Sequence, residues 1–120
     1  MKANGVNISL EAVSPSATHR GCPVEFALQL IRGKWKKRII YLIAERELRF
    51  SEILKNLEEI SQPVLARELR ELESSNLIKR VVYQQVPLRV GYSLTSVGES
   101  LLPILIDLKR WGEEYIEISL

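Results

Sequence analysis

The spacing of apolar residues along this chain predicts mostly helices. In five stretches, apolar residues recur three or four positions apart, which places them on one face of an α-helix. These stretches begin at Pro23, Lys34, Glu52, Gln62 and Ser96, and they run to about residues 32, 44, 57, 73 and 118. Three of the starts follow a hydroxyl side chain that can accept a hydrogen bond from the first turn, at Ser51, Ser61 and Thr95.

Two further stretches predict β-strands. Leu77–Tyr83 is rich in Val, Ile and Tyr, and Val90–Leu94 follows a loop, Gln84–Arg89, which contains Pro87 and ends in a basic residue. Two short helices joined by a tight turn and followed by such a hairpin make a winged helix-turn-helix. The predicted fold is therefore mainly α-helical with a small β-hairpin, of winged helix-turn-helix type.

The predicted helix from Ser61 to Glu73 has two unlike faces. One face carries leucines that should be buried, Leu65, Leu69 and Leu72. The opposite face carries a proline and two arginines, Pro63, Arg67 and Arg70. An exposed helix face with two arginines can enter a DNA major groove. An ordinary amphipathic helix with solvated charges is the alternative, because three glutamates lie close by, Glu68, Glu71 and Glu73.

Basic residues gather on both sides of this helix in the sequence. The chain has a net charge of only +2, but residues 32–49 carry +5, residues 51–73 carry −3 and residues 79–89 carry +3. Positive charge concentrated on one surface is the electrostatic footprint of a nucleic-acid-binding protein. The charge distribution therefore favours the DNA-binding interpretation.

Composition limits the class of protein. With 120 residues, 46% of them hydrophobic, the chain can form one domain with a real core. We predict a flexible N-terminal arm over residues 1–21 and one domain over residues 22–118. One cysteine permits no intrachain disulfide, no apolar run is long enough to span a membrane, and the N-terminus lacks the pattern of a signal peptide. A cytoplasmic protein is expected.

Few residues could form a catalytic or metal site. The single histidine, His19, has no second ligand-type residue nearby, and a metal site needs several ligands. The chain has no glycine-rich phosphate loop, and the spacing puts no base beside Cys22. We therefore expect no enzyme activity, no metal and no cofactor.

Cys22 has two interpretations. It precedes Pro23 at the start of the first predicted helix, where the positive end of the helix dipole favours a thiolate. The other interpretation is a small buried hydrophobic residue. Position alone does not separate them.

The last predicted helix carries more apolar surface than a small domain needs. Apolar residues repeat along it about every 3.5 positions, as in helices packed along each other, at Leu101, Ile104, Leu108, Trp111, Tyr115 and Ile118. Either the N-terminal helix or a second subunit must cover this surface, and we favour both together. The predicted dimer interface comprises Leu101, Ile104, Leu105, Leu108, Trp111 and Tyr115.

Short motifs along the chain carry a resemblance to a known family. The first are Cys22-Pro23, Gly33-Lys34-Trp35, Arg49-Phe50-Ser51-Glu52-Ile53 and Ile60-Ser61. Then come Leu69-Arg70-Glu71-Leu72-Glu73, Leu77-Ile78-Lys79-Arg80, Val86-Pro87, Arg89-Val90, Tyr92-Ser93-Leu94-Thr95, Gly98, Leu101, Pro103 and Trp111-Gly112. In this order and spacing, over roughly Cys22 to Glu114, they resemble the HxlR-type winged-helix transcription regulators.

The resemblance implies a DNA-binding homodimer of bacterial type, joined through its N-terminal and C-terminal helices. It implies a recognition helix over residues 61–73 and DNA contacts at Lys34, Arg49, Ser51, Ser61, Gln62, Pro63, Ala66, Arg67, Arg70 and Arg89. The two recognition helices of a dimer would enter successive major grooves of an inverted repeat in double-stranded DNA, about 34 Å apart. Family members are most often repressors. Several respond to oxidants or electrophiles through a cysteine at the position of Cys22, which makes Cys22 a candidate redox sensor.

The chain departs from the family's pattern near the expected DNA contacts. Ala66 replaces the usual Thr, Pro63 a polar or basic residue, and Asn76 the usual Gly. Leu88 and Gly91 replace a Pro and an acidic residue beside Arg89. These changes bear on which DNA sequence is read, and the inducer, a small molecule or an oxidant, stays open. A winged helix that binds protein without specific DNA contact is the alternative function.

Overall fold

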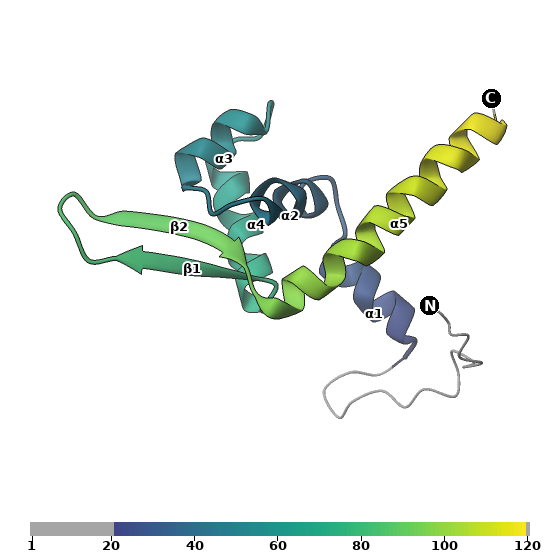
Figure 1. The fold of residues 1–120 in the computed structure, drawn as a ribbon, viewed down its shortest axis with the longest axis horizontal. Coiled ribbons are helices and arrows are strands. Elements are labelled where there is room, and N and C mark those ends of the chain that lie inside the picture. Colours follow the sequence, from purple (N-terminus) through teal and green to yellow (C-terminus); the bar gives the residue numbers. More distant parts are fainter. Residues whose placement is uncertain (1–20, 120) are drawn as a thin grey trace. The chain divides into compact units, whose positions relative to one another are not determined.

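Helices and one two-stranded sheet make up the computed structural model, which describes residues 21–119 (Figure 1). In chain order they are α1 (Pro23–Leu30), α2 (Lys36–Ala44), α3 (Phe50–Asn56), α4 (Gln62–Ser74), β1 (Ile78–Tyr83), β2 (Arg89–Leu94) and α5 (Ser96–Ser119). The predicted mainly α-helical fold with one hairpin is confirmed. The chain divides into two units, residues 1–32 and 33–120, and each is described by itself.

The first unit is described from Gly21 onward and consists of α1. Cys22 occupies the N-cap position, as the sequence predicts, and Pro23 lies in the first turn. Three large apolar residues of this helix are exposed, Val24, Phe26 and Leu28. The predicted arm over residues 1–21 and His19 lie, apart from Gly21, outside the described residues, and the predicted domain boundaries stay a prediction.

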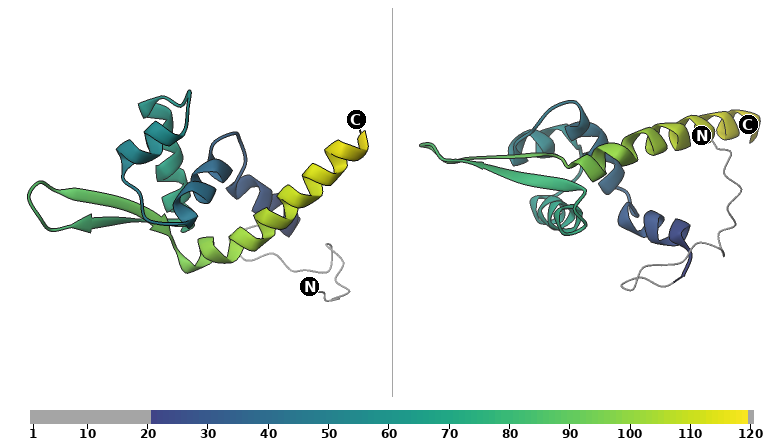
Figure 2. Two further views of the ribbon diagram at one scale, coloured as in Figure 1. Left: turned by 45° about the horizontal axis from the view of Figure 1, so that its top comes forward. Right: turned by 60° about the horizontal axis from the view of Figure 1, so that its bottom comes forward.

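The second unit is built around α2, which packs on α4, β2 and α5. In this unit the hairpin and α5 extend to opposite sides of helices α2 to α4 (Figures 1 and 2). The most deeply buried side chains come from α2, α3, α4 and β1, namely Ile39, Ile40, Ile43, Ile53, Leu65, Leu69, Leu72 and Ile78. The predicted burial of the leucine face of α4 is therefore confirmed.

The buried face of α2 is wider than its apolar spacing predicts. Spacings of four, three and one residues place Trp35, Ile39, Leu42 and Ile43 in a stripe on one helix face, but Trp35 and Leu42 are only half-buried. Lys36 and Ile40 are buried instead. The reason is that α2 is covered from more than one side, by α4, β2 and α5, so residues beside the stripe are enclosed as well.

The start of α3 differs from the prediction. Ser51 was expected to cap it, but α3 begins at Phe50 and Arg49 is the N-cap residue. The backbone N–H of Arg49 donates to Glu52 Oε1 at 2.8 Å. This hydrogen bond, together with nearby positive charge, lowers the pKa of Glu52. A carboxylate inside the helix thus takes up a free N–H at its start, and Ser51 is left exposed in the first turn.

The helix-turn-helix is closed without a glycine. In the turn between α3 and α4, Glu59 adopts a positive φ of 77°. Ser61 then caps α4, because its Oγ accepts a hydrogen bond from the Val64 N–H at 3.3 Å, as predicted. After α4, Asn76 has a left-handed conformation, with φ of 61°, which asparagine adopts at helix ends more readily than most residues do.

The hairpin pairs β1 and β2 in antiparallel register from Ile78 opposite Leu94 to Tyr83 opposite Arg89. Arg89 was predicted to end the loop, but it is the first residue of β2, because its backbone pairs with Tyr83. Leu48 forms a bridge to Tyr92 through backbone hydrogen bonds of 3.0 and 2.7 Å. The backbone is therefore extended at Leu48, whereas Phe50 belongs to α3.

The start of α5 is tied to the end of α4. Thr95 Oγ1 accepts a hydrogen bond from the Gly98 N–H at 3.0 Å, which confirms the predicted cap, and it donates to the Asn76 carbonyl at 2.6 Å. Gly98 is buried against the Leu77 carbonyl, and a Cβ at this position would collide with that oxygen. The helix therefore needs glycine here in order to approach the hairpin.

Replacing Gly98 with alanine should destabilise the protein severely, because the added methyl group meets rigid backbone rather than a movable side chain. Gly112→Ala is the matched control in the same helix, since a Cβ there meets no atom of the described chain within 4 Å. Helix propensity alone predicts that this control gains up to about 1 kcal/mol. Thermal unfolding would measure both variants, and equal melting temperatures would contradict the assigned role of Gly98.

Candidate nucleic-acid interface

The outward face of α4 is the centre of the candidate site. Ser61, Gln62, Pro63, Arg67 and Arg70 are exposed there, and Ala66 is half-buried. The leucines on the other side of the helix fix which face points outward, because they are almost fully buried. The short side chains near the helix start leave room for close approach, and the two arginines supply charge and hydrogen-bond donors.

The two arginines differ in their surroundings. Arg67 Nη2 lies 3.1 Å from Glu68 Oε2 and donates a hydrogen bond to it. Arg70 forms no ion pair or side-chain hydrogen bond with any residue in 21–119. The guanidinium of Arg67 is therefore held in place, whereas that of Arg70 is restrained only by its own rotamers.

A buried charge network lies beneath this face. Lys36 Nζ donates to Glu68 Oε1 at 2.7 Å and to Glu71 Oε1 at 2.5 Å. The side chains of Lys36 and Glu68 are only 10% and 9% exposed. Lys36 is one of the basic residues in the stretch 32–49 that was assigned to the positive surface, and for Lys36 that interpretation is wrong. The lysine is enclosed between α2 and α4, so it adds nothing to the external positive footprint.

The pairing outweighs the cost of burying Lys36. Burial acts to lower the pKa of this lysine, but its hydrogen bonds to Glu68 and Glu71 and their negative charges leave the pKa raised overall. A raised pKa means that the folded state holds the proton more tightly than the unfolded state. This contribution to stability is therefore present below the ordinary lysine value of 10.5 and is lost as pH rises through the raised value.

The start of α3 shares a cluster of arginines with the base of the wing. The wing is the hairpin loop of residues 84–88, and its base is the pair Tyr83 and Arg89 that flanks the loop. Arg46 Nη1 lies 4.0 Å from Glu52 Oε2. Besides the hydrogen bond from the Arg49 backbone, the charges of Arg46, Arg49 and Arg89 all contribute to the lowered pKa of Glu52. Two predicted DNA contacts, Arg49 and Arg89, thus lie near the same carboxylate. Arg46 belongs to the basic stretch of residues 32–49 and is a further basic residue beside these predicted contacts.

The wing is anchored at its base. The Arg89 guanidinium carbon lies 5.0 Å from the centre of the Tyr83 ring. The Tyr83 hydroxyl donates to Glu47 Oε2 at 2.7 Å, and this hydrogen bond is the main cause of the raised pKa of Tyr83. Arg89 Nε is buried and has no hydrogen-bond partner within the described chain. Arg89 is therefore positioned at the wing base by stacking on the Tyr83 ring.

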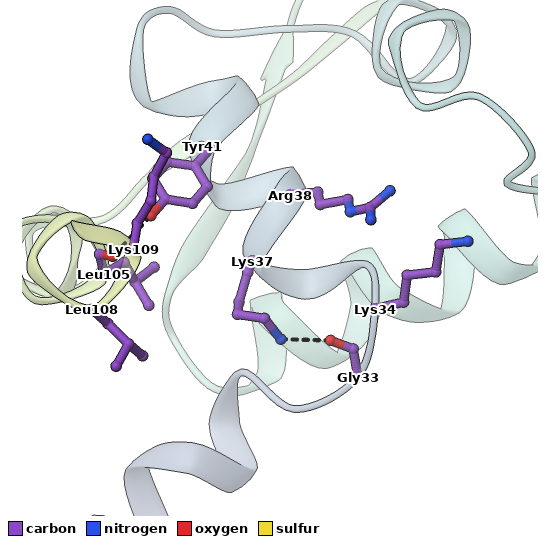
Figure 3. Close-up of a pocket in the computed structure, with 8 residues that line it drawn as sticks. All are labelled: Gly33, Lys34, Lys37, Arg38, Tyr41, Leu105, Leu108 and Lys109. Carbon is purple, nitrogen blue, oxygen red and sulfur yellow. Dashed lines mark hydrogen bonds between the residues drawn. The ribbon is translucent and has the colours of Figure 1, made fainter. Parts of the chain in front are cut away.

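Lys34, which precedes α2, and Arg38 within α2 share an aromatic neighbour. Lys34 and Arg38 lie over the ring of Trp35, at 4.7 and 5.5 Å from its centre, and point away from α5 (Figure 3). Lys34 Nζ is also 3.6 Å from Glu59 Oε1, which places Lys34 beside the turn that precedes α4. A hollow of about 460 Å³ is lined by apolar residues of α5, Leu105 and Leu108, and also by Lys34 and Arg38. Lys34 thus lies beside both the turn of the helix-turn-helix and this hollow.

The apolar residues predicted for the dimer interface lie mostly on the open side of α5. Four are exposed, namely Ile104, Leu108, Trp111 and Tyr115. The rings of Trp111 and Tyr115 stack with their centres 5.3 Å apart. Leu105 is an exception and its assignment to the interface is wrong, because it is buried within the subunit. Its carbonyl accepts a hydrogen bond from the Tyr41 hydroxyl at 2.9 Å.

Cys22 belongs to the first unit. Its thiol is neither fully buried nor fully exposed. The residue is free of any disulfide and occupies the N-cap of α1. Separately, none of the helices in residues 21–119 has the length and apolar character needed to cross a membrane.

Comparison with known proteins identifies the family of this arrangement. The sequence model of the HxlR-like helix-turn-helix family matches residues 30–119. An HTH-type transcriptional regulator of Methanothermobacter thermautotrophicus (strain Delta H) is 50% identical over 94 residues, which cover 78% of this chain and 72% of that protein. The HTH-type regulator YdeP of Bacillus subtilis (strain 168) is 46% identical over 95 residues, or 79% and 74% of the two chains.

A solved structure shows the same fold. The redox regulator HypR in its oxidised form superposes with a TM-score of 0.72 at 45% sequence identity. The superposition covers 78% of this chain and 96% of that one. The winged helix-turn-helix fold predicted from the sequence is thereby confirmed.

Lys36→Met should lower the free energy of unfolding by about 3 kcal/mol, because it leaves Glu68 buried without its lysine. Lys34→Met makes the same chemical change at an exposed ion pair and should cost less than about 1 kcal/mol. Urea unfolding at neutral pH measures both values. Similar losses in the two variants would show that the buried pair has no special weight.

Proposed function

This chain belongs to the HxlR-like helix-turn-helix family and is a transcriptional regulator of that type, and we propose that it binds an inverted-repeat operator in double-stranded DNA as a homodimer. The observation that carries the proposal is the outward face of α4. Helix α4 is the second helix of a helix-turn-helix. The leucines on its inner face are buried, and the arginines on its outward face are exposed. The alternative, a winged helix that only binds protein, gives no reason for these arginines to gather there.

In the proposed complex, α4 lies in the major groove and Arg67 and Arg70 face the base edges. The start of α3, with Arg49 and Ser51, and Lys34 beside the turn contact the phosphate backbone. Arg89 at the wing base approaches the next stretch of backbone or the minor groove, where arginine is attracted by the negative potential. Such contacts release counterions, so the affinity falls steeply as salt rises.

A homodimer explains the apolar side of α5. Exposed apolar residues that continue along one side of a helix mark an interaction surface. Here Leu108 and Trp111 are 48% and 61% exposed, and they repeat with the spacing of paired helices. α1 also exposes apolar side chains and is proposed to contribute to the same interface. Two-fold symmetry would place the two α4 helices about one DNA turn apart.

The regulator is proposed to act mainly as a repressor in the cytoplasm, where bacterial DNA lies, and to respond to oxidants or electrophiles through Cys22. Support comes from the name of the similar protein HypR, a redox regulator, and from the place of Cys22 at the N-terminus of α1. A modification of the thiol would change the packing of the dimer helices and so the separation of the two recognition helices. The proteins it matches are regulators and not enzymes.

Selection of bound fragments from random-sequence DNA tests the function. We expect an enriched inverted repeat with half-sites centred about one helical turn apart. The selection is repeated after thiol oxidation, with Cys22→Ser as the matched protein that cannot respond. Loss of enrichment in the oxidised wild type alone would assign the switch to Cys22. Weak binding without any enriched sequence, seen only at low salt, would instead favour the protein-binding alternative.

Leu108→Glu should convert the proposed dimer into a monomer, because a carboxylate would be buried against the partner helix. Ile106→Glu is the matched control, since Ile106 is similarly exposed but lies off the predicted seam. Sedimentation equilibrium gives the oligomeric state of each variant. A dimer that survives Leu108→Glu unchanged would place the interface elsewhere.

A further inference from the structure

Four charged side chains form a continuous chain from α2 to the outward face of α4. Glu71 and Glu68 both accept hydrogen bonds from Lys36, and Glu68 accepts another from Arg67. The two oxygens of Glu68 are used separately, Oε1 by Lys36 and Oε2 by Arg67. Glu68 is thus a bridge between a buried lysine and an exposed arginine of the candidate interface.

Because Glu68 is buried, its carboxylate is held in one orientation. The Glu68 side chain is 9% exposed, whereas that of Arg67 is 55% exposed. A buried carboxylate cannot rotate freely, since any other rotamer would take Glu68 away from both of its donors, Lys36 and Arg67. Lys36 of α2 therefore restrains Glu68, and Glu68 in turn restrains the guanidinium of Arg67.

We propose that Glu68 is a positioning residue for DNA recognition, which orients Arg67 before DNA is bound while Lys36 holds Glu68 in place. This inference rests on the proposed function of α4 as the recognition helix. An arginine already held in one orientation loses less conformational entropy on binding, and its planar group meets a base edge in a preset direction. Arg67 accordingly reads a base pair, with guanine as the base that a bidentate arginine prefers.

Arg70 provides the internal comparison. It lies on the same face three positions later but has no side-chain partner within residues 21–119. Its side chain has to be ordered entirely by the DNA. The two arginines should therefore respond differently to any change at Glu68, although both are exposed arginines on one helix.

The free protein offers a first test. In nitrogen-15 relaxation measurements on the wild type, the Nε–H group of Arg67 should be more ordered than that of Arg70. In Glu68→Gln, the amide oxygen can still accept from Lys36, but the amide nitrogen cannot accept from Arg67. The order of Arg67 should then fall to the level of Arg70. Equal mobility of the two groups in the wild type would overturn the proposal without any DNA present.

The second test uses the operator sequence selected by the wild type. Glu68→Gln should lose about tenfold in discrimination at one base pair, which is the magnitude of a single bidentate contact. Glu73→Gln is the matched control, because it removes the same charge from an exposed position of α4 and should leave discrimination unchanged. Both variants should bind non-specific DNA slightly more tightly, since each adds one positive charge to the total.

A double-mutant cycle separates positioning from general damage. In an Arg67→Ala background, Glu68→Gln should cause no further loss of discrimination, because the side chain that it orients is gone. In an Arg70→Ala background, the full loss should remain. Thermal unfolding of each variant identifies any loss of fold, which would lower specific and non-specific binding together rather than discrimination at one base pair.

The outcomes distinguish this inference from the proposed function. A wild type that enriches an operator, with Glu68→Gln discriminating as well as Glu73→Gln, would overturn the positioning role and leave the proposed function intact. A wild type that enriches no sequence would overturn the proposed function and the role of Glu68 in recognition together.

Discussion

The ion pairs of Lys36 with Glu68 and Glu71 are the constraint on which the placement of α4 depends. Burial of leucines holds α4 against the core, but apolar contact has no direction and tolerates small shifts. The pair of Lys36 and Glu68 does not tolerate them, because both side chains are buried and separating them would remove this charge pairing in a poorly solvated place. The ion pairs therefore fix how α4 is aligned on α2, and this alignment sets the direction of the outward face of α4.

The short helix α2 connects the parts of the second unit that have different tasks. Through Lys36 it holds α4, and through the Tyr41 hydroxyl it holds the backbone of α5 at Leu105. It also packs on β2, the strand that begins with Arg89. In the proposed mechanism, a change in the packing of α5 would thus act on the same nine-residue helix that positions the recognition elements.

The sequence was sufficient for the fold because most elements follow simple periodic rules. The leucine face of α4, the caps at Ser61 and Thr95 and the left-handed Asn76 were all predictable from local chemistry. The exceptions depend on the tertiary structure. A pattern of apolar spacing assigns every lysine to the solvent. It could not identify Lys36 as buried, because that depends on its ion pairs with Glu68 and Glu71 of another helix. Leu105, which was predicted for the dimer interface although it lies off the 3.5-residue seam, is buried within the subunit. Arg89, which was predicted to end the loop, pairs through its backbone with Tyr83.

Near the base of the wing, the absence of a side chain at Gly91 leaves room for Glu47. The Glu47 side chain occupies the space where a Cβ of residue 91 would lie, and from there its carboxylate accepts the Tyr83 hydroxyl. Glu47 and a side chain at position 91 therefore compete for one volume. During evolution, a gain of any larger residue at 91 would expel Glu47 and release Tyr83, so the two positions should vary together. Gly91 thus leaves free the space that the acidic side chain of Glu47 fills.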